Sequence, residues 1–126
     1  MKSEALAHWE YAREDLNVAR HDLPMSPRNA ATRAYYAAFH AVSAVFALEG
    51  RTFTRHSSVE SAVHRDLVKS GRWSIDLGIN YSNLFKLRQT SDYDVSETIT
   101  PEAALAAIGA AASILQAVQQ ARPELK

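Results

Sequence analysis

Arg33 and His40 are the only ionisable residues before Glu49 in the alanine- and aromatic-rich stretch NAATRAYYAAFHAVSAVFALEG, its tyrosines aside. On a helix that turns about 100° per residue, seven steps leave two side chains about 20° apart around the axis and about 10.5 Å apart along it. Asn29 and Tyr36 fall on the same stripe. The sequence therefore predicts a helix that carries one polar stripe on an otherwise apolar surface.

An arginine and a histidine on one stripe could act together on a phosphodiester. Histidine exchanges protons near neutrality, because its ordinary pKa is about 6.5. Arginine stays charged, and its planar fork matches two phosphate oxygens. His40 could take the proton of a 2′-hydroxyl or give one to the leaving oxygen while Arg33 stabilises the phosphorane, and no metal is required. Spacing alone favours the simpler alternative of a solvated face or an interhelical salt bridge.

The charge balance makes any anion site a local one. The 126 residues hold 14 Lys and Arg against 14 Asp and Glu, so no overall basic field attracts nucleic acid. Residues 41–90 are mildly basic and residues 91–126 are acidic.

The remaining composition points to a cytoplasmic protein of one domain, residues 1–126. The length suits a single core, and the absence of cysteine excludes disulfides and thiolate zinc sites. The N-terminus lacks the apolar run of a signal peptide, and no stretch approaches the ~20 apolar residues of a membrane span. His8, His21 and His64 lack helical partners at metal-ligand spacing, so we expect neither a metal nor another cofactor.

Helical periodicity and its punctuation predict an all-α fold, an up-and-down bundle of four to five antiparallel helices. The predicted helices span Ser3 to Pro24, Ser26 to Gly50, Ser57 to Gly71, a fourth from about Ser74, and Pro101 to Pro123. Ser26 with Pro27 and Thr100 with Pro101 are typical helix starts, and Ser57 with Glu60 forms a capping box. Four residues at three-and-four spacing mark the expected apolar face of the last helix: Leu105, Ile108, Ala112 and Leu115.

Apolar and small residues flank the polar stripe of the second helix. Tyr35, Phe39, Val42 and Phe46 form the expected core face. A set of alanines, small enough for close approach of another helix, could pack within the bundle or against a second copy; these are Ala34, Ala37, Ala38, Ala41 and Ala44.

The stretch RAYYAAFHAVSAVFALEG, followed by HSSVESAV and later LRQTSDYD, resembles the HEPN domain family, and in particular its short stand-alone prokaryotic branch. The resemblance covers about residues 27–120. It implies a helical bundle that forms a homodimer, in which two pairs of an arginine and a histidine separated by four to six residues face one cleft. Arg33 and His40, with six residues between them, match that pattern at its long limit.

In active members of this family the cleft cuts RNA without a metal. Such members often serve as toxins beside a small nucleotidyltransferase antitoxin. The resemblance thus implies Arg33 and His40 as catalytic residues, with RNA or nucleotide as ligand. Active members often carry a polar residue directly after the arginine, whereas this chain has Ala34. A non-catalytic module that binds nucleotide or RNA, or docks to a nucleotidyltransferase, is the alternative.

Four further residues are candidates for nucleotide or RNA binding. Tyr36 could bind a phosphate or stack on a base, or could simply pack. Arg88 and Tyr93 lie at a predicted helix end, where Arg88 and Asp92 at i,i+4 also suit ordinary helix stabilisation. Asn29 belongs to the polar stripe. A plain helical interaction protein, in which the stripe pairs with acidic residues, is the third possibility.

Overall fold

The computed structural model describes the backbone of residues 2–94 and 96–126. Among these residues it contains helices and no strand. In chain order the elements are α1 (Lys2–Asp22), α2 (Pro27–Leu48), α3 (His56–Ala62), the π-helical segment η1 (Val63–Val68), α4 (Ile75–Tyr93) and α5 (Pro101–Ala121).

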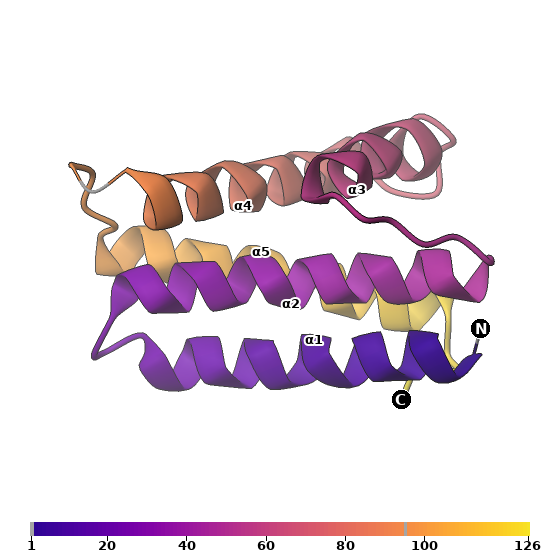
Figure 1. Cartoon of the computed structure of the whole chain (residues 1–126), viewed down its shortest axis with the longest axis horizontal. Helices are drawn as coiled ribbons and strands as arrows, with labels where there is room; N and C mark the ends of the chain where they lie inside the picture. The colour runs from indigo at the N-terminus through magenta and orange to yellow at the C-terminus, as the bar shows by residue number, and fades with distance from the viewer. Residues whose placement is uncertain (1, 95) are drawn as a thin grey trace.

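The four long helices lie side by side, and α2 packs against α1, α4 and α5 (Figure 1). α3 and η1 form a short arm beside α4, and the chain ends lie at the same end of the bundle (Figure 1). The predicted all-α bundle is confirmed. Its short connections make α1 and α2 antiparallel neighbours, which brings the polar stripe of α2 next to α1.

Most helix boundaries follow the punctuation in the sequence. The hydroxyls of Ser26, Ser74 and Thr100 each accept a hydrogen bond from the backbone N–H three residues on, which caps α2, α4 and α5. Gly50 follows α2 with a φ of +75°, a conformation that glycine adopts without strain. α1 begins at Lys2 rather than after Ser3, whose side chain lies outside the described residues.

The predicted capping box of the third helix is wrong. α3 already begins at His56, and the preceding residue, Arg55, makes no side-chain cap. Glu60 is used elsewhere, because its carboxylate accepts a hydrogen bond from Ser82 of α4 at 2.8 Å. The sequence also did not indicate the π-helical segment η1.

The alanines of α2 are buried within one chain. Ala34, Ala37, Ala38, Ala41 and Ala44 are all fully buried against the other helices of the bundle. They therefore cannot meet a second copy, and of the two predicted uses only packing within the bundle remains. Tyr35, Val42 and Phe46 are buried as predicted, while Phe39 lies at the edge of the core.

α5 departs from two expectations. Leu105 is 59% exposed, because the buried side of α5 is formed by residues such as Ala104, Ile108 and Ile114. By length and composition alone α5 could cross a membrane, since the mean hydropathy of its most apolar 18-residue window is 1.4. The expectation that no stretch approaches the length and apolarity of a membrane span is therefore wrong. The same composition occurs in core helices, and 39% of the apolar window is buried in the bundle.

Candidate functional site

Two matching sets of side chains face each other where α1 and α2 run antiparallel. Each set has residues at positions i, i+3 and i+7, which place them on one face of their helix. On α1 these are His8, Tyr11 and Asp15, and on α2 they are Arg33, Tyr36 and His40.

Asp15 lies between Arg33 and His40. Nη1 of Arg33 donates a hydrogen bond to Oδ1 of Asp15 at 3.2 Å. Nε2 of His40 lies 3.9 Å from Oδ2 of the same carboxylate, too far for a direct hydrogen bond. The side chains of Arg33 and His40 remain 33% and 21% exposed, whereas that of Asp15 is 12% exposed. Both sequence-predicted groups therefore lie on one flank and are partly open to solvent.

His8 hydrogen-bonds the other ring nitrogen of His40, Nδ1. The two Nδ1 atoms are 3.0 Å apart, so one ring donates its proton and the other accepts it. The ring of Tyr11 also lies against His40, with centroids 5.3 Å apart. When His40 is the donor at Nδ1, its Nε2 is left as a free base on the side of Asp15 and Arg33.

The environment keeps His40 neutral near neutral pH. Burial lowers the pKa of His40 to about 4, and the nearby His8, Arg33 and His56 act in the same direction. Burial also lowers the pKa of His8, against the opposing effect of Glu4. The pKa of Asp15 is raised by burial, although the Arg33 guanidinium opposes that shift. The Asp15 carboxylate does not approach Nε2 closely enough to offset the burial of the imidazole.

Tyr36 links this pair to two further predicted residues. The guanidinium carbon of Arg33 lies 4.8 Å from the centroid of the Tyr36 ring. Nη2 of Arg88 donates to the Tyr36 hydroxyl at 3.2 Å and to the Tyr93 hydroxyl at 3.4 Å. Arg88 also forms the predicted ion pair with Asp92, at 3.0 Å. Tyr36 thus lies between two guanidinium groups, and the structure brings Arg33, Tyr36, Arg88 and Tyr93 into one connected set.

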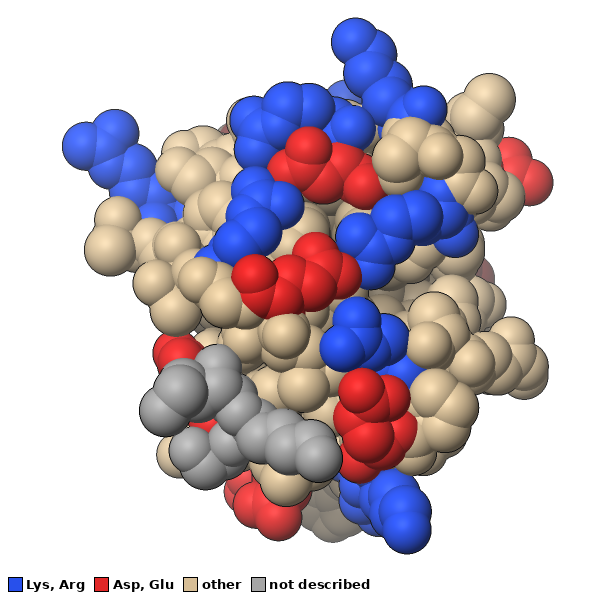
Figure 2. Space-filling model, turned by 90° about the vertical axis from the view of Figure 1, so that its right-hand side faces the viewer, with Lys and Arg blue, Asp and Glu red and all other residues tan. Residues whose placement is uncertain are grey.

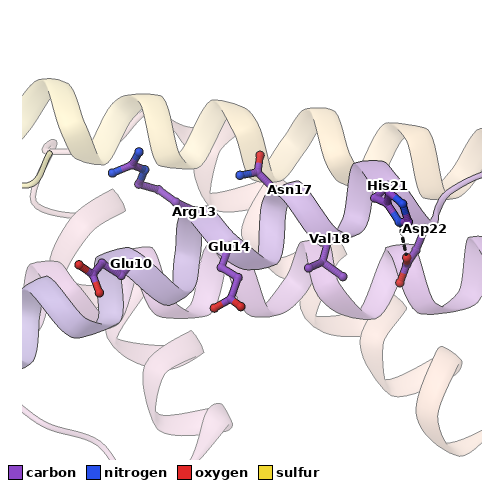
Figure 3. Close-up of a pocket in the computed structure, with 7 residues that line it drawn as sticks. All are labelled: Glu10, Arg13, Glu14, Asn17, Val18, His21 and Asp22. Carbon is purple, nitrogen blue, oxygen red and sulfur yellow. Dashed lines mark hydrogen bonds and ion pairs between the residues drawn. The ribbon is translucent and has the colours of Figure 1, made fainter.

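Asn29 points to a different part of the bundle. Its side-chain amide donates to Asp22 at the end of α1, and its backbone N–H donates to Ser26. Asp22 also lines a shallow hollow of about 570 Å³ along α1 (Figure 3). None of the sequence-predicted site residues lines that hollow, whose other members are Glu10, Arg13, Glu14, Asn17, Val18 and His21.

The arm that contains α3 closes the opposite edge of the site. The ring of His56 lies 4.5 Å from that of Phe39, centroid to centroid. The hydroxyl of Tyr35 hydrogen-bonds Nδ1 of His56 at 2.8 Å. Burial, followed by the charge of Arg88, lowers the pKa of His56. The site therefore holds three histidines whose pKa values are all below the ordinary value.

The sequence prediction missed His8, Tyr11 and Asp15, because it considered the second helix alone. A usable signal was present, since these three residues repeat the i, i+3, i+7 spacing of the α2 stripe on the preceding helix. Two antiparallel neighbours with equally spaced polar stripes bring those stripes together. As for metals, the described part of the chain contains no group of three or more His, Cys, Asp or Glu side chains placed to hold an ion.

Comparison with known proteins assigns the chain to a family. The family model described as "HEPN domain" matches residues 5–121. The chain belongs to the HEPN domain family. A "UPF0332 protein" from Thermotoga maritima is 33% identical over 127 residues, which cover 99% of this chain and 96% of that protein.

A solved structure shares the architecture of this HEPN protein. The crystal structure of TT1696 from Thermus thermophilus matches with a TM-score of 0.79. The match covers 95% of this chain and 98% of that one at 22% sequence identity. This similarity supports the HEPN helical bundle as a fold and carries no information on activity.

Proposed function

We propose that this HEPN protein is a metal-independent endoribonuclease. The observation that carries the proposal is the placement of a guanidinium and a neutral imidazole beside one carboxylate, with Arg33 and His40 at 3.2 Å and 3.9 Å from Asp15. A general base must be unprotonated at the working pH, which the lowered pKa of His40 ensures, while a pKa of about 4 also makes the imidazole a weaker base than one that titrates near neutrality.

The reaction would use the 2′-hydroxyl of RNA as nucleophile. Nε2 of His40 takes the hydroxyl proton as the 2′-oxygen bonds to phosphorus, and the P–O5′ bond breaks. The products are a 2′,3′-cyclic phosphate and a 5′-hydroxyl, whose oxygen takes a proton from water. Arg33 stabilises the charge that develops on the phosphoryl oxygens. His8, by accepting the Nδ1 proton of His40, keeps Nε2 unprotonated and oriented.

Cleavage of a labelled single-stranded RNA in the presence of EDTA tests this function. Removing a general base typically costs about 10²- to 10⁴-fold in rate, so His40→Ala and Arg33→Ala should each lose at least about 100-fold. His21→Ala, a substitution of a strongly exposed histidine outside the site, is the matched control and should cut at the wild-type rate. Cleavage that survives either site substitution would remove the assignment.

Non-catalytic binding of nucleotide or RNA at the same surface is the second candidate. It is favoured by the contacts that already occupy Arg33 and His40, namely those with Asp15 and His8. Exposed aromatic rings such as Tyr11 and Tyr93, the latter beside the Arg88 guanidinium, suit stacking on bases. Binding of an oligonucleotide that depends on Arg33 and Tyr36, without cleavage, would establish this alternative.

The partners implied by the family complete the proposal. We infer a homodimer in which two of these surfaces share a cleft, and a toxin role in which a nucleotidyltransferase acts as antitoxin. Co-expression of the chain with a nucleotidyltransferase, should an adjacent reading frame encode one, would test the second part. Relief of growth inhibition and a stable complex are expected, and an unchanged toxicity would contradict it.

A further inference from the structure

A basic surface covers the end of the bundle at which α2, η1 and α5 finish. We call it the basic end and define it by five cationic residues: Arg51, Arg65, Lys69, Arg72 and Arg122. Figure 2 views this end and shows Lys and Arg side chains gathered over much of its upper part, with acidic side chains between them. The whole chain has no net charge, and the five cations therefore make this end locally positive.

Two arginines of the basic end share the carboxylate of Asp66. Arg51 contacts it at 2.8 Å and Arg65 at 3.0 Å. The hydrogen bonds from Arg65 and Arg51 hold the pKa of Asp66 at about 2, so the carboxylate remains charged and keeps both guanidinium groups in place. Arg51 also lies over the ring of Phe53, with its guanidinium carbon 5.3 Å from the centroid.

Glu49 is shared in the same way. Arg72 contacts it at 2.7 Å and Arg122 at 3.7 Å, and Arg122 also contacts Glu124 at 3.4 Å. Lys69 is exposed and makes no ion pair with any described residue. The five cations therefore exceed the three carboxylates that pair with them. Each shared carboxylate holds its arginines in place but also weakens their attraction for a further anion, so the excess of cations over carboxylates supplies the net positive charge of this end.

Two hollows connect the basic end to the candidate site. The first is small, about 50 Å³, and is lined by His8 and Phe39 of the site, by Arg51 and Phe53 of the loop after α2, and by the acidic Glu4. The second is lined by Phe53 again, by Arg65 and by three hydroxyl groups, those of Ser57, Ser58 and Ser61. The two hollows share Phe53, and together they form a surface path from His8, the partner of His40, past Arg51 to Arg65.

We propose that this path and the basic end bind the backbone of a single-stranded RNA whose reacting phosphate lies at Arg33 and His40. The inference rests on the proposed function and names the extent of its substrate. Guanidinium groups bind phosphates, and serine hydroxyls hydrogen-bond phosphate and 2′-hydroxyl oxygens. A path that turns over the end of a bundle suits a flexible single strand, whereas a stiff duplex could not follow it.

Binding of 2′-O-methyl oligonucleotides, which cannot be cut, tests the path with the full chain. Oligomers of about 4 and about 14 nucleotides should distinguish the site from the site with its extension. The double variant Arg65→Gln/Lys69→Gln removes two exposed cations of the basic end. Arg20→Gln/Lys86→Gln removes two exposed cations elsewhere and is the matched control.

We expect the basic-end variant to bind the long oligomer at least about fivefold more weakly. For this variant the slope of log Kd against the logarithm of the salt concentration should fall by about 1.4, because each of the two lost phosphate contacts on a single strand contributes about 0.7. Its affinity for the short oligomer and both affinities of the control should stay within about twofold of the wild type. Equal weakening of both oligomers, or no change for the long one, would overturn the path.

Arg33→Gln separates this inference from the function on which it depends. When Arg33→Gln weakens both oligomers and the basic-end variant changes neither, the site stands and the path is wrong. When Arg33→Gln leaves both affinities unchanged, the proposed function fails at its own site. If the basic-end variant still weakens binding of the long oligomer while Arg33→Gln has no effect, the basic end binds RNA independently of Arg33 and His40. That result would contradict the path as stated.

Discussion

At the residue scale, Asp15 sets how strongly Arg33 can attract a phosphate. Its carboxylate lies 3.2 Å from the guanidinium and is mostly buried. A negative charge at that distance satisfies the arginine but repels an incoming anion. The same carboxylate would stabilise the imidazolium that forms when His40 takes a proton, so Asp15 favours the reaction while it weakens ground-state binding.

The substitution Asp15→Asn should therefore strengthen binding and slow cleavage. We expect the Kd of an uncleavable 2′-O-methyl RNA to fall about fivefold, equivalent to about 1 kcal/mol of removed repulsion. Glu14→Gln, a change of a neighbouring exposed acid, should leave Kd unchanged. An Asp15→Asn protein with unaltered or weaker RNA affinity in titrations by fluorescence anisotropy would show that Asp15 does not face the bound phosphate.

The low pKa of His40 makes the free energy of unfolding depend on pH. The pKa is about 4 in the folded chain against an ordinary 6.5, so the unfolded chain binds more protons between these pH values. The contribution of neutral His40 is complete above about pH 6.5 and is lost as pH falls toward 4. Asp15, whose pKa is raised, acts in the opposite sense in the acidic range.

His40→Gln should reduce this loss of stability. Between pH 7 and pH 4.5 we expect the wild type to lose about 1 to 3 kcal/mol more than the variant, as measured by urea unfolding at each pH. Parallel stability curves for the two proteins would mean that His40 titrates normally in the folded state.

Only some of the site residues could be predicted from the sequence. Helical spacing is enough to align Arg33 with His40, because both lie on one helix. The partners His8 and Asp15 depend on how α1 is rotated and shifted against α2, which one helix does not reveal. Asn29 shares the α2 stripe and nevertheless pairs with Asp22, because it lies at the end of α2 next to the turn from α1.

At the element scale, Gly78 allows η1 to pack closely on α4. A Cβ at this position would lie 2.6 Å from Cγ2 of Val68, a contact that requires one of the two segments to move. Gly78→Ala should therefore destabilise the chain by about 1 to 3 kcal/mol, despite the better helix propensity of alanine.

Gly109 of α5 provides the control for that change. Nothing lies within 4 Å of a Cβ built there, so Gly109→Ala should stabilise the chain by about 0.5 to 1 kcal/mol. Thermal or urea unfolding of both variants measures the difference. Equal effects of the two substitutions would mean that η1 does not pack on α4 at Gly78.

Helix positions were predicted well where caps and breakers are strong. Ser26, Thr100 and Gly50 act locally, so their effect can be read without the rest of the fold. Ser57 failed as a cap, because Glu60 bonds to α4 instead of to the helix start. The sequence also could not predict which face of α5 is buried, because apolar residues surround most of this helix and no polar stripe marks its outer side.

At the scale of the whole molecule, the buried alanines of α2 limit how two copies could meet. A dimer that shares a cleft between two Arg33–His40 surfaces must use side chains that are still exposed beside them, such as Tyr11 at 55% exposure. Bundle architecture followed from helix lengths and short connections, whereas the association of copies depends on such exposed positions.

Sedimentation of two charge variants tests the dimer. We expect the wild-type chain to sediment as a dimer at micromolar concentration and Tyr11→Glu to sediment as a monomer, because the new charge would be buried in the shared cleft. Leu105→Glu, on the outer side of α5, should remain dimeric. A monomeric wild type, or dissociation only by Leu105→Glu, would contradict the shared cleft.

The most direct test of the account is an NMR titration of the histidine rings with and without an uncleavable 2′-O-methyl RNA. We predict that His40 stays neutral down to about pH 5 and that its ring signals, and not those of exposed His21, shift when the RNA is added. A His40 that is unaffected by RNA while distant histidines respond would contradict a catalytic surface at Arg33 and His40, and a His40 that titrates near its ordinary pKa of about 6.5 would contradict the burial that lowers this pKa.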